Sequence, residues 1–175
     1  MRKSLVLFAL LLLGAIALPA SGLAQESPPA TASCTFAGGK TIKVNYSSPR
    51  MRGRKIFGGL VPYGEVWRAG ANEATTIVAN TNLVVGRKEV PAGSYTIFTI
   101  PNRDKWTLIV SKQTGEWGIP YPGEQYDFAR VDMQLAKLPS PVQNFTISFD
   151  NAGGRCAMRM DWETTRASIG MSEGK

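Results

Sequence analysis

Short segments in which apolar and polar residues alternate with a period of two constrain the fold of this chain more than any other feature. In the segment KWTLIVSK, for example, Trp106, Leu108 and Val110 alternate with Thr107 and Ser111, and side chains of alternate residues point to opposite faces of a β-strand. Turn residues such as those at 91–93 and 101–104 separate the segments, which predicts hairpins. No segment keeps a 3.6-residue period for three turns, so we expect no long helix.

Eight or nine such segments follow one another, and alternation this regular is typical of antiparallel sheets with one face in solvent. The expected fold is all-β, an antiparallel β-sandwich or flattened barrel of about eight to nine strands. We expect one domain over residues 34–165 and a frayed tail at 166–175. Two segments, 47–73 and 114–127, do not alternate; the first, a long irregular loop near the N-terminus, is of a length that is usually functional or locally structured.

The first 24 residues have the features of a secretory signal peptide. Arg2 and Lys3 precede an apolar run at 5–18, and small residues lead to Ala24, after which we expect cleavage. That run is short for a membrane span and no second one follows, so we expect export to the periplasm or the extracellular space with no membrane span. Residues 25–33, rich in Ser, Pro, Ala and Thr, are expected to form a flexible leader.

The charge of the chain bears on its partners. Removal of Arg2 and Lys3 lowers the formal net charge from +7 to +5, which is a modest basic excess. Export argues against nucleic acid as the reason for this excess, and anionic components of the cell envelope remain as partners.

The two cysteines suggest a disulfide bond in an exported chain. Cys156 shares its strand parity with Met158 and Trp162, and Cys34 shares its parity with Phe36, so both sulfurs are expected to point inward. A bridge between them would tie the first strand to the last, which is worth about 4–5 kcal/mol in the chain-entropy model. The alternative is that both thiols are buried and form no disulfide bond.

The sequence contains no histidine, which excludes histidine-dependent nucleophilic mechanisms and most zinc and copper sites. It also lacks the Gly-x-Ser-x-Gly elbow, the phosphate-cradling loop and the dinucleotide fingerprint. We therefore assign no catalytic residue and expect no cofactor or metal. Hydrolysis by paired carboxylates stays open, because Glu65, Glu73, Glu116 and Glu124 lie in the two irregular segments.

The first irregular segment has an excess of positive charge, from Arg50, Arg52, Arg54, Lys55 and Arg68. Guanidinium groups present a planar fork of donors to carboxylate, phosphate or sulfate, so these residues predict a patch that recognises anions. A solvated loop is the alternative. We expect Arg68 and Glu73 to form an internal ion pair that fixes the loop.

Four aromatic residues of the irregular segments could form a platform for a sugar or a peptide: Tyr63, Trp67, Trp117 and Tyr121. Trp67 could equally close one end of the sandwich. Asn72 follows two small residues, Gly70 and Ala71, and suits a left-handed or capping backbone conformation.

Long motifs in this region resemble an exported bacterial family known as domain of unknown function 2911. The resemblance rests on SPRMRGRKIFGGLVPYGEVWRAGANEATT, VPAGSYTIFTIP, WTLIVSKQTGEWG and FARVDMQL, and covers about residues 45–150. It implies a compact β-rich exported domain, and it brings no known activity, ligand or catalytic residue.

The leading hypothesis is a non-catalytic binding or interaction module of the cell envelope that recognises an anionic or carbohydrate-like group. Alternatives are a hydrolase that uses paired loop carboxylates and a purely structural envelope protein. The candidate ligand-binding residues are Arg50, Arg52, Arg54, Tyr63, Trp67, Arg68, Glu73, Trp117 and Tyr121.

Overall fold

The computed structural model describes residues 27–175, and within them nearly every element is a β-strand. One 3₁₀ turn, η1, is the exception. The elements are β1 (Pro29–Thr35), β2 (Thr41–Ser47), β3 (Thr76–Ala79), β4 (Leu83–Val85), β5 (Lys88–Val90), β6 (Gly93–Pro101), β7 (Trp106–Ser111), η1 (Glu124–Tyr126), β8 (Asp127–Ala152) and β9 (Arg155–Glu173).

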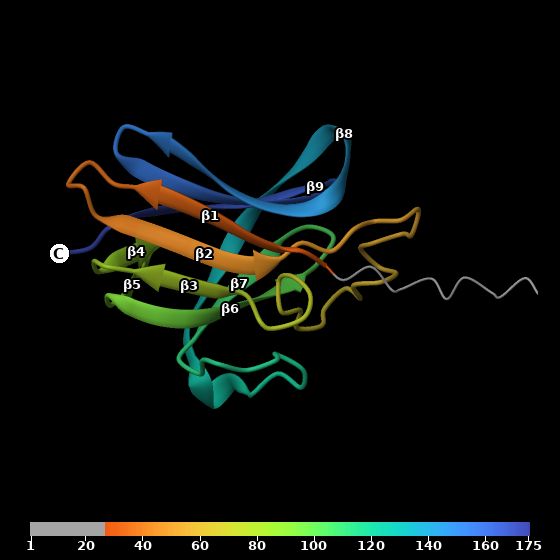
Figure 1. The fold of residues 1–175 in the computed structure, drawn as a ribbon, viewed down its shortest axis with the longest axis horizontal. Coiled ribbons are helices and arrows are strands. Elements are labelled where there is room, and N and C mark those ends of the chain that lie inside the picture. The colour runs from red at the N-terminus through yellow and green to blue at the C-terminus, as the bar shows by residue number, and fades with distance from the viewer. Residues whose placement is uncertain (1–26) are drawn as a thin grey trace, which may run out of the picture.

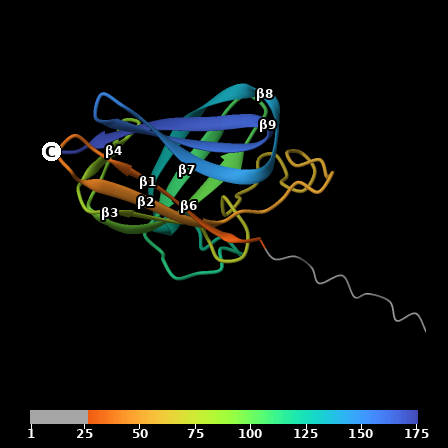
Figure 2. The same ribbon diagram turned by 45° about the horizontal axis from the view of Figure 1, so that its top comes forward.

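The nine strands form one antiparallel sheet in the order β1-β2-β3-β6-β7-β8-β9-β4-β5. β8 pairs with β7 up to Met133 and with β9 from Gln134 onward. This long strand therefore belongs to both halves of the sheet. One half contains β1, β2, β3, β6 and β7, and the other contains β9, β4 and β5. The sheet folds over on itself, and β8 and β9 lie above β1 and β2 (Figures 1 and 2). The all-β antiparallel fold with eight to nine strands is therefore confirmed.

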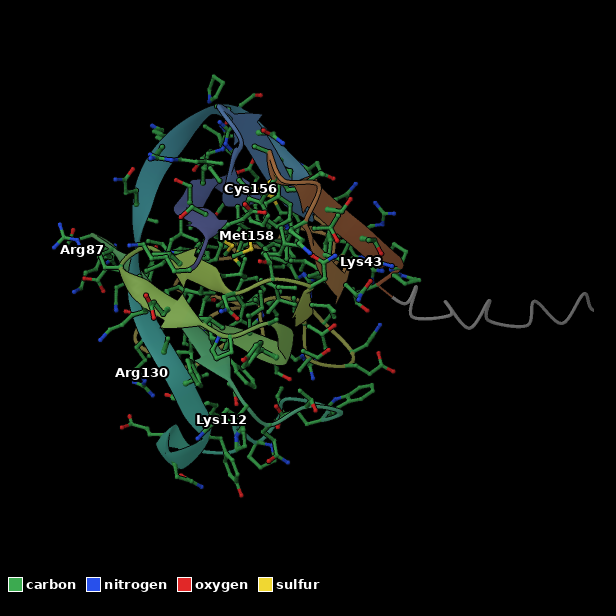
Figure 3. The ribbon with its side chains drawn as sticks, turned by 90° about the vertical axis from the view of Figure 1, so that its left-hand side faces the viewer. Lys43, Arg87, Lys112, Arg130, Cys156 and Met158 are labelled. Carbon is green, nitrogen blue, oxygen red and sulfur yellow. A yellow bond between two sulfur atoms is a disulfide. The ribbon has the colours of Figure 1, made fainter. Side chains whose placement is uncertain are left out.

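The core lies between the two halves, as the alternation predicts. Ile42 and Val44 of β2 and Met158 of β9 are buried, while Lys43 is exposed. Figure 3 shows Cys156 and Met158 inside the molecule and Lys43 at its surface. Every second residue of a strand thus faces apolar neighbours.

The predicted disulfide is present. It joins Cys34 of β1 to Cys156 of β9, with the two Cα atoms 6.1 Å apart and the two residues separated by 122 positions. Both cysteines are buried, in agreement with the parity of their strands. The bond connects an edge strand of one half of the sheet to a strand of the other half.

The predicted boundaries of the domain are too narrow. β1 begins at Pro29 and pairs with β2, so most of the expected leader at 25–33 is strand. The expected frayed tail at 166–175 is wrong, because β9 continues to Glu173 and pairs with β4. Alternate residues of this tail are buried, namely Ala167, Ile169 and Met171. The predicted signal peptide lies outside the described residues.

Candidate functional site

The long irregular segment, residues 48–75, joins β2 to β3 and runs over one end of the folded sheet (Figure 1). Short backbone bridges hold it there. Arg50 pairs with Asn144 of β8, and Trp67 exchanges two backbone hydrogen bonds with Thr99 of β6, at 2.7 and 2.8 Å. The segment is therefore irregular, as predicted, and it is anchored to both halves of the sheet.

An aromatic cluster lies beneath this segment. The rings of Trp67 and Trp162 are stacked with centroids 5.9 Å apart, and Phe145 meets the edge of Trp67 at 4.9 Å. Trp67 Nε1 donates to the carbonyl oxygen of Gly70 at 3.1 Å, so the indole has its polar partner inside the protein. Trp67 thus closes one end of the core, which is one of the two alternatives drawn from the sequence.

A groove of about 420 Å³ lies above this cluster, and we call it the arginine groove. Its walls come from the irregular segment, from the loop that precedes η1 and from β9. It is lined by Ser27, Pro49, Arg50, Arg52, Arg54, Leu60, Val61, Trp67, Arg68, Gly70, Ala71, Ile119 and Trp162. Among these lining residues of the described chain there are four arginines and no Asp or Glu.

Neutral oxygens hold three of the four groove arginines. Arg50 Nη1 donates to Asn144 Oδ1 at 2.5 Å, and Arg54 Nη2 donates to the carbonyl oxygen of Arg50 at 2.8 Å. Arg68 Nη1 donates to the carbonyl oxygen of Trp117 at 3.2 Å, with its guanidinium 5.5 Å from the centre of the Trp117 ring.

Elsewhere in the protein the pattern is different. Arg130, Arg159 and Arg166 each form an ion pair with an aspartate. Within residues 27–175, by contrast, no carboxylate forms an ion pair with Arg50, Arg54 or Arg68. Within the described residues, contact with acidic side chains therefore does not neutralise the charges of these three arginines.

The predicted ion pair between Arg68 and Glu73 is wrong. Glu73 is exposed, and the guanidinium of Arg68 turns instead to the Trp117 carbonyl and ring. Burial lowers the pKa of Arg68, and the negative charge of Glu73 offsets part of this shift. Arginine stays protonated at physiological pH, so Arg68 is a partly dehydrated cation without a contacting anion in the described chain.

Several residues beside the groove have a left-handed backbone. Arg52, Ala69 and Asn72 have φ values of 49°, 50° and 56°, a conformation that is uncommon outside glycine. The prediction for Asn72 is confirmed, and its side chain donates to the carbonyl oxygen of Ser27 at 3.1 Å. These turns fix the course of the segment that carries the arginines.

The loop before η1 forms the second wall of the groove. Gly118 has a φ of 82°, and a Cβ atom there would lie 2.9 Å from Ala74 Cβ and 3.0 Å from Arg68 Cβ. Only glycine allows this approach. On either side of it, Trp117 is 53% exposed and Ile119 is 66% exposed.

The lining residues that were not predicted from the sequence include two exposed apolar ones, Leu60 and Ile119. Apolar residues in Gly- and Pro-rich loops ordinarily indicate local core contacts, and no pattern in the sequence marks these two as exposed. Leu60 is 46% exposed.

The two predicted tyrosines lie outside the arginine groove. Tyr63 packs under the guanidinium of Arg103, at 4.8 Å, and lines a separate hollow with Asn102. Tyr121 hydrogen-bonds Asp127 and packs edge-on against Phe98 at 5.2 Å. Burial and the hydrogen bond to Asp127 raise the pKa of Tyr121 to about 12.

The four loop glutamates also lie outside the lining of the groove. Glu65 and Glu73 are exposed, and Glu124 forms an ion pair with Arg130 at 3.1 Å. Glu116 Oε1 is buried without a hydrogen-bond partner, and burial raises the pKa of this carboxyl group. Among residues 27–175, the lining of the groove therefore contains no carboxylate pair of the kind that a glycosidase uses.

Two further observations concern the described chain as a whole. Between residues 27 and 175, no three Cys, Asp or Glu side chains come together in a way that could hold a metal ion. No helix in the same range has the length and apolarity needed to cross a membrane.

Comparison with known proteins gives one match. The family model described as "Protein of unknown function (DUF2911)" matches residues 27–171, which is a longer stretch than the motifs alone covered. No curated protein and no solved structure matches the chain.

Proposed function

The chain belongs to the DUF2911 family of proteins of unknown function, and from its own side chains we propose that it is a non-catalytic module that binds an anionic ligand in the arginine groove. The observation that carries the proposal is the charge of the lining, which has four arginines and no acidic residue among the described residues. Guanidinium groups bind carboxylate, phosphate and sulfate through paired N–H donors.

The arrangement of the arginines supports binding of a compact anion. Arg54 is folded against the Arg50 carbonyl, and Arg50 is held by Asn144, so part of their conformational freedom is already lost before a ligand arrives. Such preorganisation lowers the entropic cost of binding. A volume of about 420 Å³ is within the usual range for small-ligand sites.

The aromatic residues favour an anionic ligand over a neutral carbohydrate. Trp67 is part of the core cluster, and Tyr63 and Tyr121 lie elsewhere. Trp117 is the exposed ring beside the groove, and Arg68 covers one of its faces. The rings of Trp67 and Trp162 also line the groove, but they are stacked on each other, which leaves little free ring surface for a neutral sugar.

We place this module in the cell envelope, after export. The basic and apolar start of the sequence supports export, and so does the Cys34–Cys156 bond, because disulfides persist in oxidising compartments. An exported protein meets anionic sugars, phosphates and lipids in that environment.

A thermal-shift experiment tests the proposal. The oxidised protein, without residues 1–24, is heated with inorganic phosphate, sulfate, an anionic sugar or a neutral sugar. We expect an anion at about 100 times its Kd to raise Tm by roughly 5–10 °C, and a neutral sugar to have little effect.

The variant Arg52→Ala/Arg54→Ala should lose this shift. The matched control is Arg87→Ala/Lys88→Ala, which removes the same charge from the exposed β4–β5 turn. A shift that both double variants retain equally, or that none of the anions produces, would contradict an anion site in the groove.

A further inference from the structure

Exposed apolar side chains gather beside the arginine groove. Leu60 and Ile119 line it, and Trp117 contacts Arg68. These three are half of the large hydrophobic residues that are exposed in the described chain, the others being Val78, Tyr126 and Phe128. Exposed apolar groups that cluster beside charged ones mark interaction sites.

The fold holds these side chains outward. Gly118 fits closely against Ala74 and Arg68, so the loop cannot rotate freely at this position. The Arg68 guanidinium packs on the Trp117 ring, which keeps the ring beside the groove. Leu60 comes from the other irregular segment, and its backbone N–H is bonded to the carbonyl oxygen of Lys55 at 3.1 Å.

We propose that this end of the molecule docks onto a bilayer surface that contains anionic phospholipids. Leu60, Trp117 and Ile119 would enter the boundary between headgroups and acyl chains, and the groove arginines would bind lipid phosphates. The inference rests on the proposed function, because the phosphate of the lipid headgroup is the anion that the groove holds.

The combination of residue types favours a lipid surface over an acidic protein. Trp is enriched at the headgroup level of membranes, and an apolar face beside basic residues is typical of proteins that lie on anionic bilayers. An acidic peptide would neutralise the arginines but would leave Ile119, which is 66% exposed, in water.

The opposite end of the molecule supplies a control surface. The β4–β5 turn carries Arg87 and Lys88, both exposed, and lies away from the irregular segment (Figure 1). Figure 3 shows Arg87 projecting from the surface. Attraction by net charge alone would involve both ends, whereas the proposed docking involves only one.

Vesicle flotation near physiological salt tests the inference, with vesicles of phosphatidylcholine alone or mixed with phosphatidylglycerol. We expect binding only to the mixed vesicles. Each basic residue near the surface adds to partitioning, so Arg52→Ala/Arg54→Ala should weaken it by roughly 30-fold. Trp117→Ala/Ile119→Ser should weaken it at least about tenfold, and Arg87→Ala/Lys88→Ala by less than about threefold.

Tryptophan fluorescence gives a second measurement of the same contact. Trp106 and Trp162 are buried and Trp67 is half-buried, so Trp117 is the exposed one of the four. Its emission should shift to shorter wavelength on the mixed vesicles, and Trp117→Phe should abolish that shift.

The outcomes separate the two proposals. A phosphate-dependent thermal shift without flotation overturns membrane docking and leaves the anion site intact. Flotation that is insensitive to Trp117→Ala/Ile119→Ser, or that falls equally in the Arg87/Lys88 variant, shows adsorption by charge alone and also overturns docking. Binding of poly-glutamate in place of the mixed vesicles would assign the surface to an acidic protein. Absence of both the thermal shift and flotation would refute both proposals.

Discussion

Arginine side chains in this protein differ in their partners, and the difference between a carboxylate and a carbonyl partner decides what each can do. Arg166 is held by both carboxylate oxygens of Asp161, at 2.8 and 2.6 Å, and this hydrogen bonding raises its pKa. Arg54 and Arg68 rest on backbone carbonyls, which orient a guanidinium but do not neutralise it. Only the second kind retains a net charge for a ligand.

Glu116 allows a test at a single residue. Its Oε1 is buried without a hydrogen-bond partner, and burial raises its pKa above the ordinary 4.5. The folded state therefore binds this proton more tightly than the unfolded state does, so the contribution of Glu116 to stability falls as pH rises from about 4.5 through the raised pKa. At neutral pH the charged group is destabilising.

We expect Glu116→Gln to raise Tm by about 2–4 °C at pH 7, because a neutral amide costs less to bury than a carboxylate. The advantage should disappear below pH 4.5, where the wild-type carboxyl is also neutral. Differential scanning calorimetry across this range measures it, with the exposed Glu65→Gln as control. An equal gain at every pH would show that the charge of Glu116 is not the cause.

Single residues also show how far the sequence predicts the site. The groove arginines and the conformation of Asn72 follow from residue type and spacing. The ion pair of Arg68 fails because sequence proximity to Glu73 does not reveal that Trp117, far along the chain, supplies a carbonyl and a ring. Exposed Leu60 and Ile119 were missed because an apolar residue in a loop does not reveal whether anything covers it.

At the level of elements, the strands are predictable and their continuity is not. The alternating segments at 128–138 and 144–150 predict two strands, where the structure has the single long β8. Pro139 and Pro141 lie between these segments. Because proline has no backbone N–H to donate to a neighbouring strand, the two prolines indicate an interruption of the strand. The pairing of β8 with β9 instead shifts register between Lys137 and Val142 and continues. The tail of β9 was misjudged because β4, its partner, is distant in sequence.

The loop before η1 offers a test of an element through two of its glycines. Gly118 and Gly115 both have a left-handed backbone, with φ values of 82° and 76°. A Cβ on Gly118 would meet Ala74 and Arg68, whereas nothing lies within 4 Å of one on Gly115. The two positions therefore share the backbone strain of an alanine substitution and differ in the contact.

We expect Gly118→Ala to lower the free energy of unfolding by about 2–4 kcal/mol and Gly115→Ala by about 1–2 kcal/mol. Urea denaturation measures both. Because Gly118 seats Trp117 and Ile119, its variant should also lose binding to the mixed vesicles under conditions where it remains folded. Equal losses of stability in the two variants would show that the docking of this loop contributes nothing.

At the scale of the whole molecule, the groove and the disulfide depend on different contacts. Residues 48–75 are tied to β8 and β6 through Asn144 and Thr99. The Cys34–Cys156 bond ties the edge strand β1 to β9. The anchors of the groove at Asn144 and Thr99 thus do not involve the strand β1 that the disulfide ties to β9.

Removal of the disulfide should therefore lower the free energy of unfolding but have little effect on anion binding in the groove. The 122-residue separation corresponds to about 4–5 kcal/mol in the chain-entropy model, so Cys34→Ala/Cys156→Ala should unfold at a much lower guanidinium concentration. Its m-value should rise, because the unfolded chain expands without the cross-link. Reduced wild-type protein should unfold at the same guanidinium concentration as the variant. Addition of reductant should not change the unfolding midpoint of the variant.

Binding gives the decisive comparison. The phosphate-dependent rise in Tm should persist in Cys34→Ala/Cys156→Ala, measured from its own lower baseline, because the contacts of Arg50 and Trp67 remain. A loss of this rise in a variant that is still folded would mean that the edge strand β1 positions the groove, through Ser27 at its rim. A loss of stability below about 1 kcal/mol would instead mean that the unfolded chain is already compact without the bond.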